Sequence, residues 1–296
     1  MSPLSPILAA LHAAPLRVWS IIVTLYGDAI VARGGMLDLA TMLRIFAAMG
    51  IGPGAVRTAV SRLAADGWLV GRKVGRASFY RLTGKGEEIF AAAARRIYRG
   101  APPEWDGDLR LVLLPPEAAT DAARAALLDA GFVAPVPGLW IAPPGAGAMP
   151  TPIATLATAV VLDARAEGPS GPRLAALAWP LARLAGGYGR FAALFGPLAR
   201  WLEEGGALSG LEALVARTLL IHHYRRVILH DPDLPLALLP ADWPGVAARE
   251  LCRRLDAALF APSEAWLDQH ARIPEGALPP AAATHPRFQE DNQPGK

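Results

Sequence analysis

The chain has 296 residues, of which 53% are hydrophobic and 19% are charged. This balance excludes a disordered polyelectrolyte, and no apolar run reaches the roughly 18 uncharged residues of a membrane-spanning helix. At about 100 to 200 residues per domain, the length predicts two or three domains. The single cysteine, Cys252, cannot form an internal disulfide, and the N-terminus lacks the regions of a secretory signal, so we expect a cytoplasmic protein.

The net charge of +3 conceals an asymmetry along the chain. Residues 1–100 contain 13 lysines and arginines against 5 acidic residues, a balance of +8, whereas the remainder contains 16 against 21. Because phosphate neutralisation needs locally clustered cations, this pattern favours a polyanion as the partner of the N-terminal part only. The plainer interpretation is a solvated basic face.

Apolar residues at three- and four-residue spacing predict three successive helices near the N-terminus. The first lies within 15–31, the second within 39–46, and the third begins at Pro53, whose missing amide proton costs nothing in a first turn. In the third helix we expect Val56, Ala59, Val60 and Leu63 to face inward. The outward set is then Arg57, Thr58, Ser61 and Arg62.

The segment 68–82 has β-branched and aromatic residues around two glycines, which predicts a β-hairpin, and Thr83 is expected to cap the helix that follows. A helix followed by such a hairpin is typical of a winged helix-turn-helix that binds duplex DNA. The outward arginines of the third helix could contact guanine, while Thr58 and Ser61 could reach bases or phosphates. The hairpin residues expected to contact the DNA backbone or minor groove are Arg72, Lys73, Arg76 and Ser78.

The spacing of the apolar residues changes after a predicted linker at Pro102-Pro103. The segments 109–114, 117–130, 132–136, 139–142, 153–156 and 159–162 read in turn as strand, helix, strand, strand, helix and strand. This βαββαβ order predicts a small ferredoxin-like sheet with helices on one face.

The last part of the chain is mostly helical, with apolar periodicity in 177–198, 211–229 and 246–260. We therefore predict an α+β multidomain protein. Its parts are a winged helix-turn-helix at 1–101, a ferredoxin-like domain at 102–170, an all-α C-terminal domain at 171–275 and a disordered tail at 276–296.

Several motifs together resemble the PaaX transcriptional repressors of phenylacetic acid catabolism. They lie at 22–28, 56–63 with 67–69, 105–107, 138–141, 221–226, and 231–235 with 238–243. The resemblance spans nearly the whole chain. It implies a homodimeric repressor with a winged-helix head, a Cas2-like middle domain and a helical C-terminal domain, which binds double-stranded operator DNA and releases it on binding phenylacetyl-CoA.

Five residues of the helical part could form the effector site, because they offer cations for coenzyme A phosphates and rings for a phenyl group. They are Tyr188, Arg190, His222, Arg225 and Arg226. A buried polar network that braces the helical domain is an equally open interpretation. Side chains of adjacent residues on a helix point in different directions, which disfavours a metal site at His222 and His223. We expect no metal and no cofactor.

Other classes of function find less support in the sequence. A metal-dependent nuclease would need carboxylates at the end of the strand 109–114, which runs into Leu114-Pro115-Pro116 instead. Cys252 has apolar neighbours and is expected to be inert. We therefore expect binding rather than catalysis. The alternatives are an interaction scaffold that does not bind DNA, and an acyl-CoA-binding protein or thioester enzyme.

Overall fold

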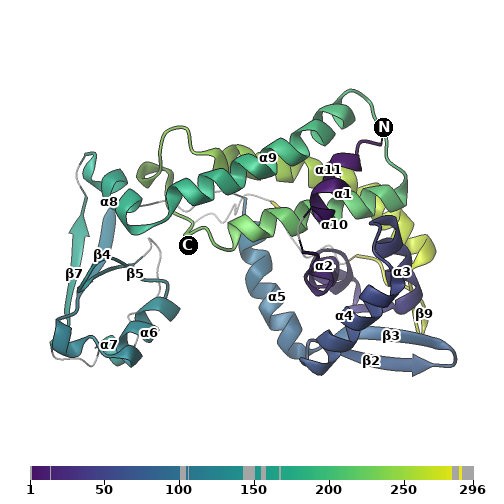
Figure 1. Ribbon diagram of the computed structural model, residues 1–296, viewed down its shortest axis with the longest axis horizontal. Helices are drawn as coiled ribbons and strands as arrows, with labels where there is room; N and C mark the ends of the chain where they lie inside the picture. Colours follow the sequence, from purple (N-terminus) through teal and green to yellow (C-terminus); the bar gives the residue numbers. More distant parts are fainter. Residues whose placement is uncertain are drawn as a thin grey trace, which may run out of the picture. The chain divides into compact units, whose positions relative to one another are not determined.

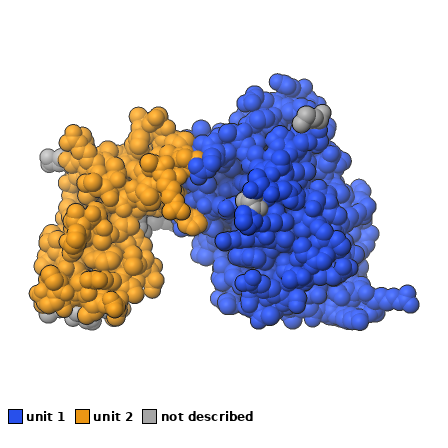
Figure 2. All heavy atoms as spheres, in the orientation of Figure 1, with its two compact units in different colours: residues 1–100, 188–229, 245–296 blue, residues 101–187, 230–244 orange. Residues whose placement is uncertain are grey.

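The computed structural model describes residues 2–13, 15–100, 105, 107–142, 151–154, 158–166, 168–281 and 287–288. The chain divides into two compact units, coloured separately in Figure 2. Unit 1 comprises residues 1–100, 188–229 and 245–296, and unit 2 comprises residues 101–187 and 230–244. Both units combine helices with antiparallel sheets, so the chain is of the α+β class.

The first hundred residues form helices around a small sheet (Figure 1). Helix α1 (Ser5–His12) precedes α2 (Val18–Leu25), which continues through a π-helical turn, η1 (Tyr26–Ile30), and a 3₁₀ turn, η2 (Val31–Arg33). The remaining elements are β1 (Met36–Asp38), α3 (Leu39–Ala48), α4 (Pro53–Ala65), β2 (Leu69–Val74), β3 (Ala77–Leu82) and α5 (Gly84–Ile97).

Local chemistry sets the ends of these helices. The Asp38 carboxylate accepts a hydrogen bond of 2.7 Å from the amide of Thr41 and so caps α3. Pro53 occupies the first turn of α4, and Gly67, just beyond its end, has a φ of 72°. The predicted cap at Thr83 is confirmed, because its hydroxyl accepts a hydrogen bond from the amide of Gly86.

The sheet of this part is antiparallel, with the strand order β1-β3-β2. Strands β2 and β3 pair from Leu69 opposite Leu82 to Val74 opposite Ala77, which leaves Gly75 and Arg76 as a two-residue hairpin loop. Gly75 has a φ of 58°, a conformation that such loops require and glycine adopts without strain. The hairpin agrees with the sequence prediction. Strand β1 was not predicted, because three residues are too few to show an alternating pattern.

Helices from the second half of the chain complete unit 1. Helix α9 (Leu181–Glu203) enters it at residue 188 and is followed by α10 (Gly210–Ile228), α11 (Pro244–His270) and the short hairpin of β8 (Arg272–Ile273) and β9 (Gly276–Ala277). Helix α10 is buried on nearly every side and packs against α2, α3 and α5. The units therefore divide the chain differently from the expected domains, because α10 and α11 share their core with the first hundred residues.

Unit 2 contains a four-stranded antiparallel sheet with the strand order β5-β6-β4-β7. Its elements are β4 (Asp108–Leu113), η3 (Pro116–Ala118), α6 (Asp121–Asp129), β5 (Val133–Val136), β6 (Leu139–Ile141), α7 (Thr151–Ala154), β7 (Val160–Arg165), α8 (Ser170–Ala178) and η4 (Leu236–Leu238). The first six strands and α-helices after residue 105 follow the predicted βαββαβ order. Val112, Leu127, Trp140 and Ile153 are buried together in its core.

Part of the C-terminal tail, for which the sequence predicted disorder, packs against unit 1. Residues 276–281 include strand β9 and a buried Leu278, and residues 287–288 lie against the body of unit 1, with Phe288 only 6% exposed. These residues are ordered by packing and ion pairs that composition does not reveal. The rest of the expected tail, and the linker at 102–103, lie outside the described residues. Within the described part of the chain, no helix is long and apolar enough to cross a membrane.

Candidate nucleic-acid interface and effector residues

Helix α4 separates its apolar and polar residues as the sequence predicts. Val56, Ala59, Val60 and Leu63 are buried against the core. The opposite face carries Arg57, Thr58, Ser61 and Arg62, all of which are exposed. A helix with this surface can enter a major groove about 12 Å wide and present hydrogen-bond donors and acceptors to base edges.

The ion pair between Arg62 and Asp66 is weak. The Arg62 Nε lies 3.7 Å from the Asp66 carboxylate, and the two side chains are 72% and 55% exposed. Exposed pairs of this kind contribute roughly 0 to 1 kcal/mol. The guanidinium of Arg62 can therefore exchange this partner for a base or a phosphate at little cost.

The β2–β3 hairpin places its basic residues beside α4. Arg72, Lys73 and Arg76 are exposed, while Ser78 is half-buried opposite Lys73. Helix α4 packs against β2, so the hairpin and the exposed face of α4 belong to one module. The structure thus brings the eight predicted DNA-contacting residues together on one helix and one hairpin, and seven of the eight are exposed.

One hairpin cation already has an acidic neighbour. Arg72 Nη1 donates to the Glu275 carboxylate at 3.2 Å, from the loop between β8 and β9. Both side chains are about 60% exposed, so water screens this pair as well. A DNA phosphate that approached Arg72 would compete with Glu275.

The five predicted effector residues differ in their burial and in their contacts. His222 is buried, and its Nδ1 lies 3.2 Å from the hydroxyl of Thr24, which itself donates to the carbonyl oxygen of Ser20. Since the only proton of the Thr24 hydroxyl is used there, His222 Nδ1–H donates to Thr24. Burial, with help from nearby Arg225, lowers the pKa of His222 to about 3, so this ring is neutral at pH 7.

Arg225 also contacts helix α2. Its Nη2 donates to both the carbonyl oxygen and the hydroxyl of Ser20, at 3.0 and 2.6 Å. Burial and the neighbouring Arg226 lower the pKa of Arg225, as expected for a cation drawn into the interior. For His222 and Arg225, the bracing interpretation describes their contacts better than an open ligand site does.

The other three predicted effector residues have different environments. Tyr188 is buried in α9, whereas Arg190 and Arg226 are exposed. The rings of His222 and His223 lie 5.8 Å apart at 88°, and His223 packs against Phe195. The rings of the two histidines therefore meet edge to face.

A small cavity lies beside Arg225, where η1, α5 and α10 meet. Its volume is about 20 Å³, and its lining includes Thr24, Gly27, Phe90, Tyr98 and Arg225. The Phe90 ring packs so closely on Gly27 that a β-carbon there would stand 2.2 Å from it. A space of this size holds about one water molecule, whereas a cavity of about 150 Å³ is needed for a benzene ring. An aryl group could enter only if Phe90 moved.

Two family models match the chain. One, described as PaaX-like protein, matches residues 17–86, and the other, described as PaaX-like protein C-terminal domain, matches residues 179–269. The Transcriptional repressor PaaX of Escherichia coli (strain K12) is 34% identical over 292 residues, covering 94% of this chain and 92% of that relative. The chain belongs to the PaaX-like family. This is a family of transcriptional repressors, regulators rather than enzymes.

A solved structure shares the fold of the PaaX-like chain. The uncharacterized protein Rv0674 from Mycobacterium tuberculosis is similar with a TM-score of 0.50 and 22% sequence identity. The match covers 81% of this chain and 98% of that chain. At this identity, the likeness concerns the fold alone.

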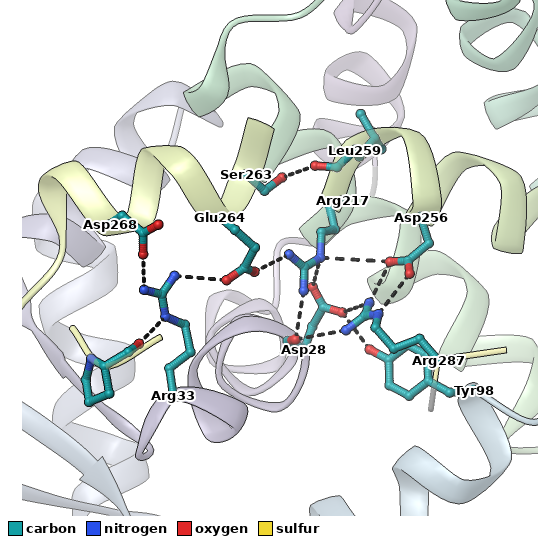
Figure 3. A network of polar contacts seen from close by, with 11 residues as sticks. Asp28, Arg33, Tyr98, Arg217, Asp256, Leu259, Ser263, Glu264, Asp268 and Arg287 are labelled. Carbon is teal, nitrogen blue, oxygen red and sulfur yellow. Dashed lines mark hydrogen bonds and ion pairs between the residues drawn. The ribbon is translucent and has the colours of Figure 1, made fainter. Parts of the chain in front are cut away.

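A buried ionic network joins the two regions that the PaaX-like models match (Figure 3). Arg217 of α10 is 1% exposed, and its guanidinium contacts Asp28 at 2.9 Å and Glu264 at 2.6 Å. Arg33 of η2 contacts the other oxygen of Glu264 at 2.9 Å and also pairs with Asp268. Sequence reasoning missed this network. The available signal was Arg217, a lone cation in an otherwise apolar stretch of helix.

The single cysteine of the PaaX-like chain is buried. Cys252 is fully buried in α11, and burial together with nearby Asp256 raises the pKa of its thiol well above the usual value. The thiol is therefore protonated at pH 7 and is a poor nucleophile. Among the described residues, no group of three histidine, cysteine or acidic side chains is placed to hold a metal ion.

Proposed function

We propose that this protein is a DNA-binding repressor of phenylacetate catabolism genes that leaves its operator when it binds phenylacetyl-CoA. The observation that carries the DNA-binding part is the exposed polar face of α4 beside the basic β2–β3 hairpin. The name of the E. coli relative, a transcriptional repressor, supports the regulatory role. A regulator of chromosomal genes would act in the cytoplasm.

In this proposal the N-terminal part is a winged helix-turn-helix. Helices α2, α3 and α4 and the sheet β1-β3-β2 supply the elements of that module, with α4 as the reading helix and the β2–β3 hairpin as the wing. The strand order β5-β6-β4-β7 in unit 2 supports a ferredoxin-like, Cas2-like middle domain in this proposal. The helical C-terminal part would then brace the head rather than stand as a separate body, since α10 packs on α2, α3 and α5.

The proposed module reads DNA by two kinds of contact. Arg57 and Arg62 are suited to guanine in the major groove, with Thr58 and Ser61 reaching bases or phosphates. The wing cations would neutralise flanking phosphates and so give affinity that depends on salt. A homodimer would place two reading helices about 34 Å apart, or a multiple of that distance, on a palindromic site.

The effector part of the proposal uses the exposed arginines of the C-terminal helices. Arg190 and Arg226 are exposed and can meet coenzyme A phosphates, whereas His222 and Arg225 are bonded to α2 and Tyr188 is buried, so we assign these three a supporting role. The phenyl group would need space near Phe90, where the present cavity is too small. The effector would then act by favouring a conformation that does not bind DNA, and could lower operator affinity only by its differential affinity for the two conformations.

Selection from a random duplex library, followed by mobility-shift titration, tests the proposal. We expect a palindromic site to be enriched, with an affinity that falls as salt rises by a slope of about −0.9 per phosphate contact. Phenylacetyl-CoA should weaken this binding, whereas coenzyme A alone should not. An interaction scaffold would show no salt-dependent duplex binding, and a thioester enzyme would hydrolyse phenylacetyl-CoA in the same tubes. Either result would refute the proposal.

A further inference from the structure

The tail residues Arg287 and Phe288 occupy a site that other segments of unit 1 build (Figure 3 shows the contacts of Arg287). The Arg287 guanidinium donates to both oxygens of the Asp256 carboxylate, at 2.8 and 2.5 Å. It also donates to the carboxylate of Asp28 at 2.5 Å and to the carbonyl oxygen of the same residue at 3.1 Å. One guanidinium therefore ties η1, near the N-terminus, to α11.

Tyr98 forms the aromatic part of this site. Its ring lies 4.3 Å from the Arg287 guanidinium carbon and meets the Phe288 ring edge-on at 5.5 Å between centroids. Its hydroxyl donates to Asp28 at 2.6 Å, and its carbonyl oxygen accepts the amide proton of Phe288 at 2.9 Å. A cation over a ring and an edge-to-face ring pair are both favourable geometries, so the site recognises an arginine followed by an aromatic residue.

The receptor side of the contact has supports of its own. Asp28, Tyr98 and Asp256 lie on or beside helices, and with the tail in place they are 3%, 7% and 3% exposed. Arg217 approaches the two carboxylates from another element and contacts Asp28 at 2.9 Å and Asp256 at 3.8 Å. The carboxylates are therefore held in place by a cation that belongs to α10.

The charge of the site favours a cationic ligand. Without Arg287, the carboxylates of Asp28 and Asp256 would share the guanidinium of Arg217, which also pairs with Glu264. Arg33 is engaged elsewhere, with the other oxygen of Glu264 and with Asp268. Buried carboxylates left without a partner are costly, so an empty site would attract a guanidinium strongly.

The tail is attached to the body by two separate anchors. The first is Leu278 and Pro279, where Leu278 is buried and the carbonyl oxygen of Pro279 accepts a hydrogen bond of 2.7 Å from Arg33 Nε. The second is the pair Arg287 and Phe288, eight residues from the end of the chain. The second anchor is largely buried, since the Arg287 side chain is 16% exposed and Phe288 is 6% exposed.

We propose that Asp28, Tyr98 and Asp256 form a binding site for an arginine followed by an aromatic residue, which the chain fills with its own tail as a releasable strap. The strap holds the N-terminal helices to α11. This inference depends on contacts within unit 1 and not on the proposed DNA binding or effector.

A full-length Arg287→Gln variant tests the proposal, with Arg253→Gln as the matched control. Arg253 lies on the exposed side of α11 and pairs with Glu250. We expect Arg287→Gln to lower Tm by about 6 °C or more and the control to leave it within about 2 °C. A synthetic peptide of residues 284–291, added in trans, should bind the Arg287→Gln variant with 1:1 stoichiometry in calorimetry and restore Tm.

Three comparisons make the peptide experiment specific. The wild-type protein should bind the peptide at least about ten-fold more weakly, because its own tail competes at an effective concentration near the millimolar range. A peptide in which glutamine replaces the arginine should bind neither protein. Adding Asp256→Asn to the Arg287→Gln variant should abolish peptide binding. Equal peptide affinity for wild type and Arg287→Gln, or no binding to the variant, would overturn the proposal.

If Arg287→Gln does not fold, the wild-type protein still decides the matter. Hydrogen exchange followed by mass spectrometry reports on the amide of Phe288, which is bonded to Tyr98. An excess of the 284–291 peptide should displace the strap and speed exchange in the tail, while the glutamine peptide should not. Unchanged exchange at millimolar peptide would refute a releasable strap.

Discussion

At the scale of single residues, the buried arginines of unit 1 are the least expected feature of this chain. Arg33 and Arg217 are each 1% exposed, and both are paired with carboxylates. Breaking a buried ion pair by removing one partner costs more than the pair contributes, because the remaining charge has no solvent and no partner. The free energy of unfolding should therefore respond sharply to a change at Arg217.

We predict that Arg217→Met destabilises the protein by about 3 to 5 kcal/mol, although methionine fits the apolar surroundings. The reason is that Asp28 and Glu264 lose a partner at 2.9 and 2.6 Å. Urea unfolding followed by circular dichroism would measure the change. The exposed Arg254→Met on α11 is the control, and it should stay within about 0.5 kcal/mol of wild type. A loss at Arg217 no larger than the control's would contradict the structural account.

His222 is a second residue whose environment has a measurable consequence. His222 lies on α10 and is buried against α2. Burial, as the main cause, and the positive charge of Arg225, as the second, lower its pKa from 6.5 to about 3. Burial likewise lowers the pKa of His223 to about 4. In the unfolded chain both rings become protonated below about pH 6.5. In the folded protein His223 stays neutral down to about pH 4 and His222 down to about pH 3. The unfolded state thus binds more protons in this window, and stability falls as the pH falls.

We predict that the free energy of unfolding declines by up to about 1.4 kcal/mol per pH unit for each of these histidines as the pH falls from 6.5 toward the folded pKa of that ring. In the window from pH 6 to 5, His222→Asn should reduce the total slope by about 1 kcal/mol per pH unit, since asparagine can still donate to Thr24 but does not titrate. Chemical unfolding at half-unit pH steps would show this. An identical slope in the variant and the wild type would mean that the ring is not shielded as described.

At the scale of elements, the sequence predicts α4 and the β2–β3 hairpin well but not the surroundings of α10. In α4 one face is apolar and the other polar, so helical periodicity alone assigns Val56 inward and Arg57 outward. Helix α10 is buried on nearly every side, and its polar residues face different neighbours. Periodicity cannot say that Arg225 meets Ser20 while Arg226 is exposed. The sequence therefore places His222, Arg225 and Arg226 on one helix but leaves their contacts undetermined, and the effector role of these residues stays a prediction.

The two DNA-binding elements should respond differently to substitution. On the proposed function, Arg57→Ala on α4 should cost about 1 to 3 kcal/mol in binding the selected operator and relax its specificity. Lys73→Ala on the hairpin should weaken binding to all sequences and reduce the salt slope by about 1. Mobility-shift titrations with operator and scrambled duplexes would separate the two effects. Arg253→Ala on α11 is the control, and equal behaviour of all three variants would argue against this division of roles.

At the scale of the whole molecule, the boundaries of the compact units follow long-range contacts that leave no local trace in the sequence. Asp28 and Arg217 are 189 residues apart, and Arg33 and Glu264 are 231 residues apart, yet each pair is in direct contact. Changes in the period of the apolar pattern predicted the first six strands and α-helices of unit 2 in their correct order. They also suggested a separate helical domain at 171–275, whereas α10 and α11 complete the core of the N-terminal part. Pairings over such distances require the structure.

This arrangement predicts that a fragment of residues 1–101 will not behave as an independent domain. Without α10 and α11, the carboxylate of Asp28 and the guanidinium of Arg33 lose their buried ionic partners, and the apolar faces of α2, α3 and α5 that α10 covers meet water. We expect the isolated fragment to show no cooperative thermal transition by near-ultraviolet circular dichroism under conditions in which the full chain melts cooperatively. Adding a separately expressed fragment of residues 171–296 should restore a transition, because it returns both the covering helices and the ionic partners. A fragment 1–101 that melts cooperatively within about 5 °C of the full chain would show that the head is stable without the C-terminal helices.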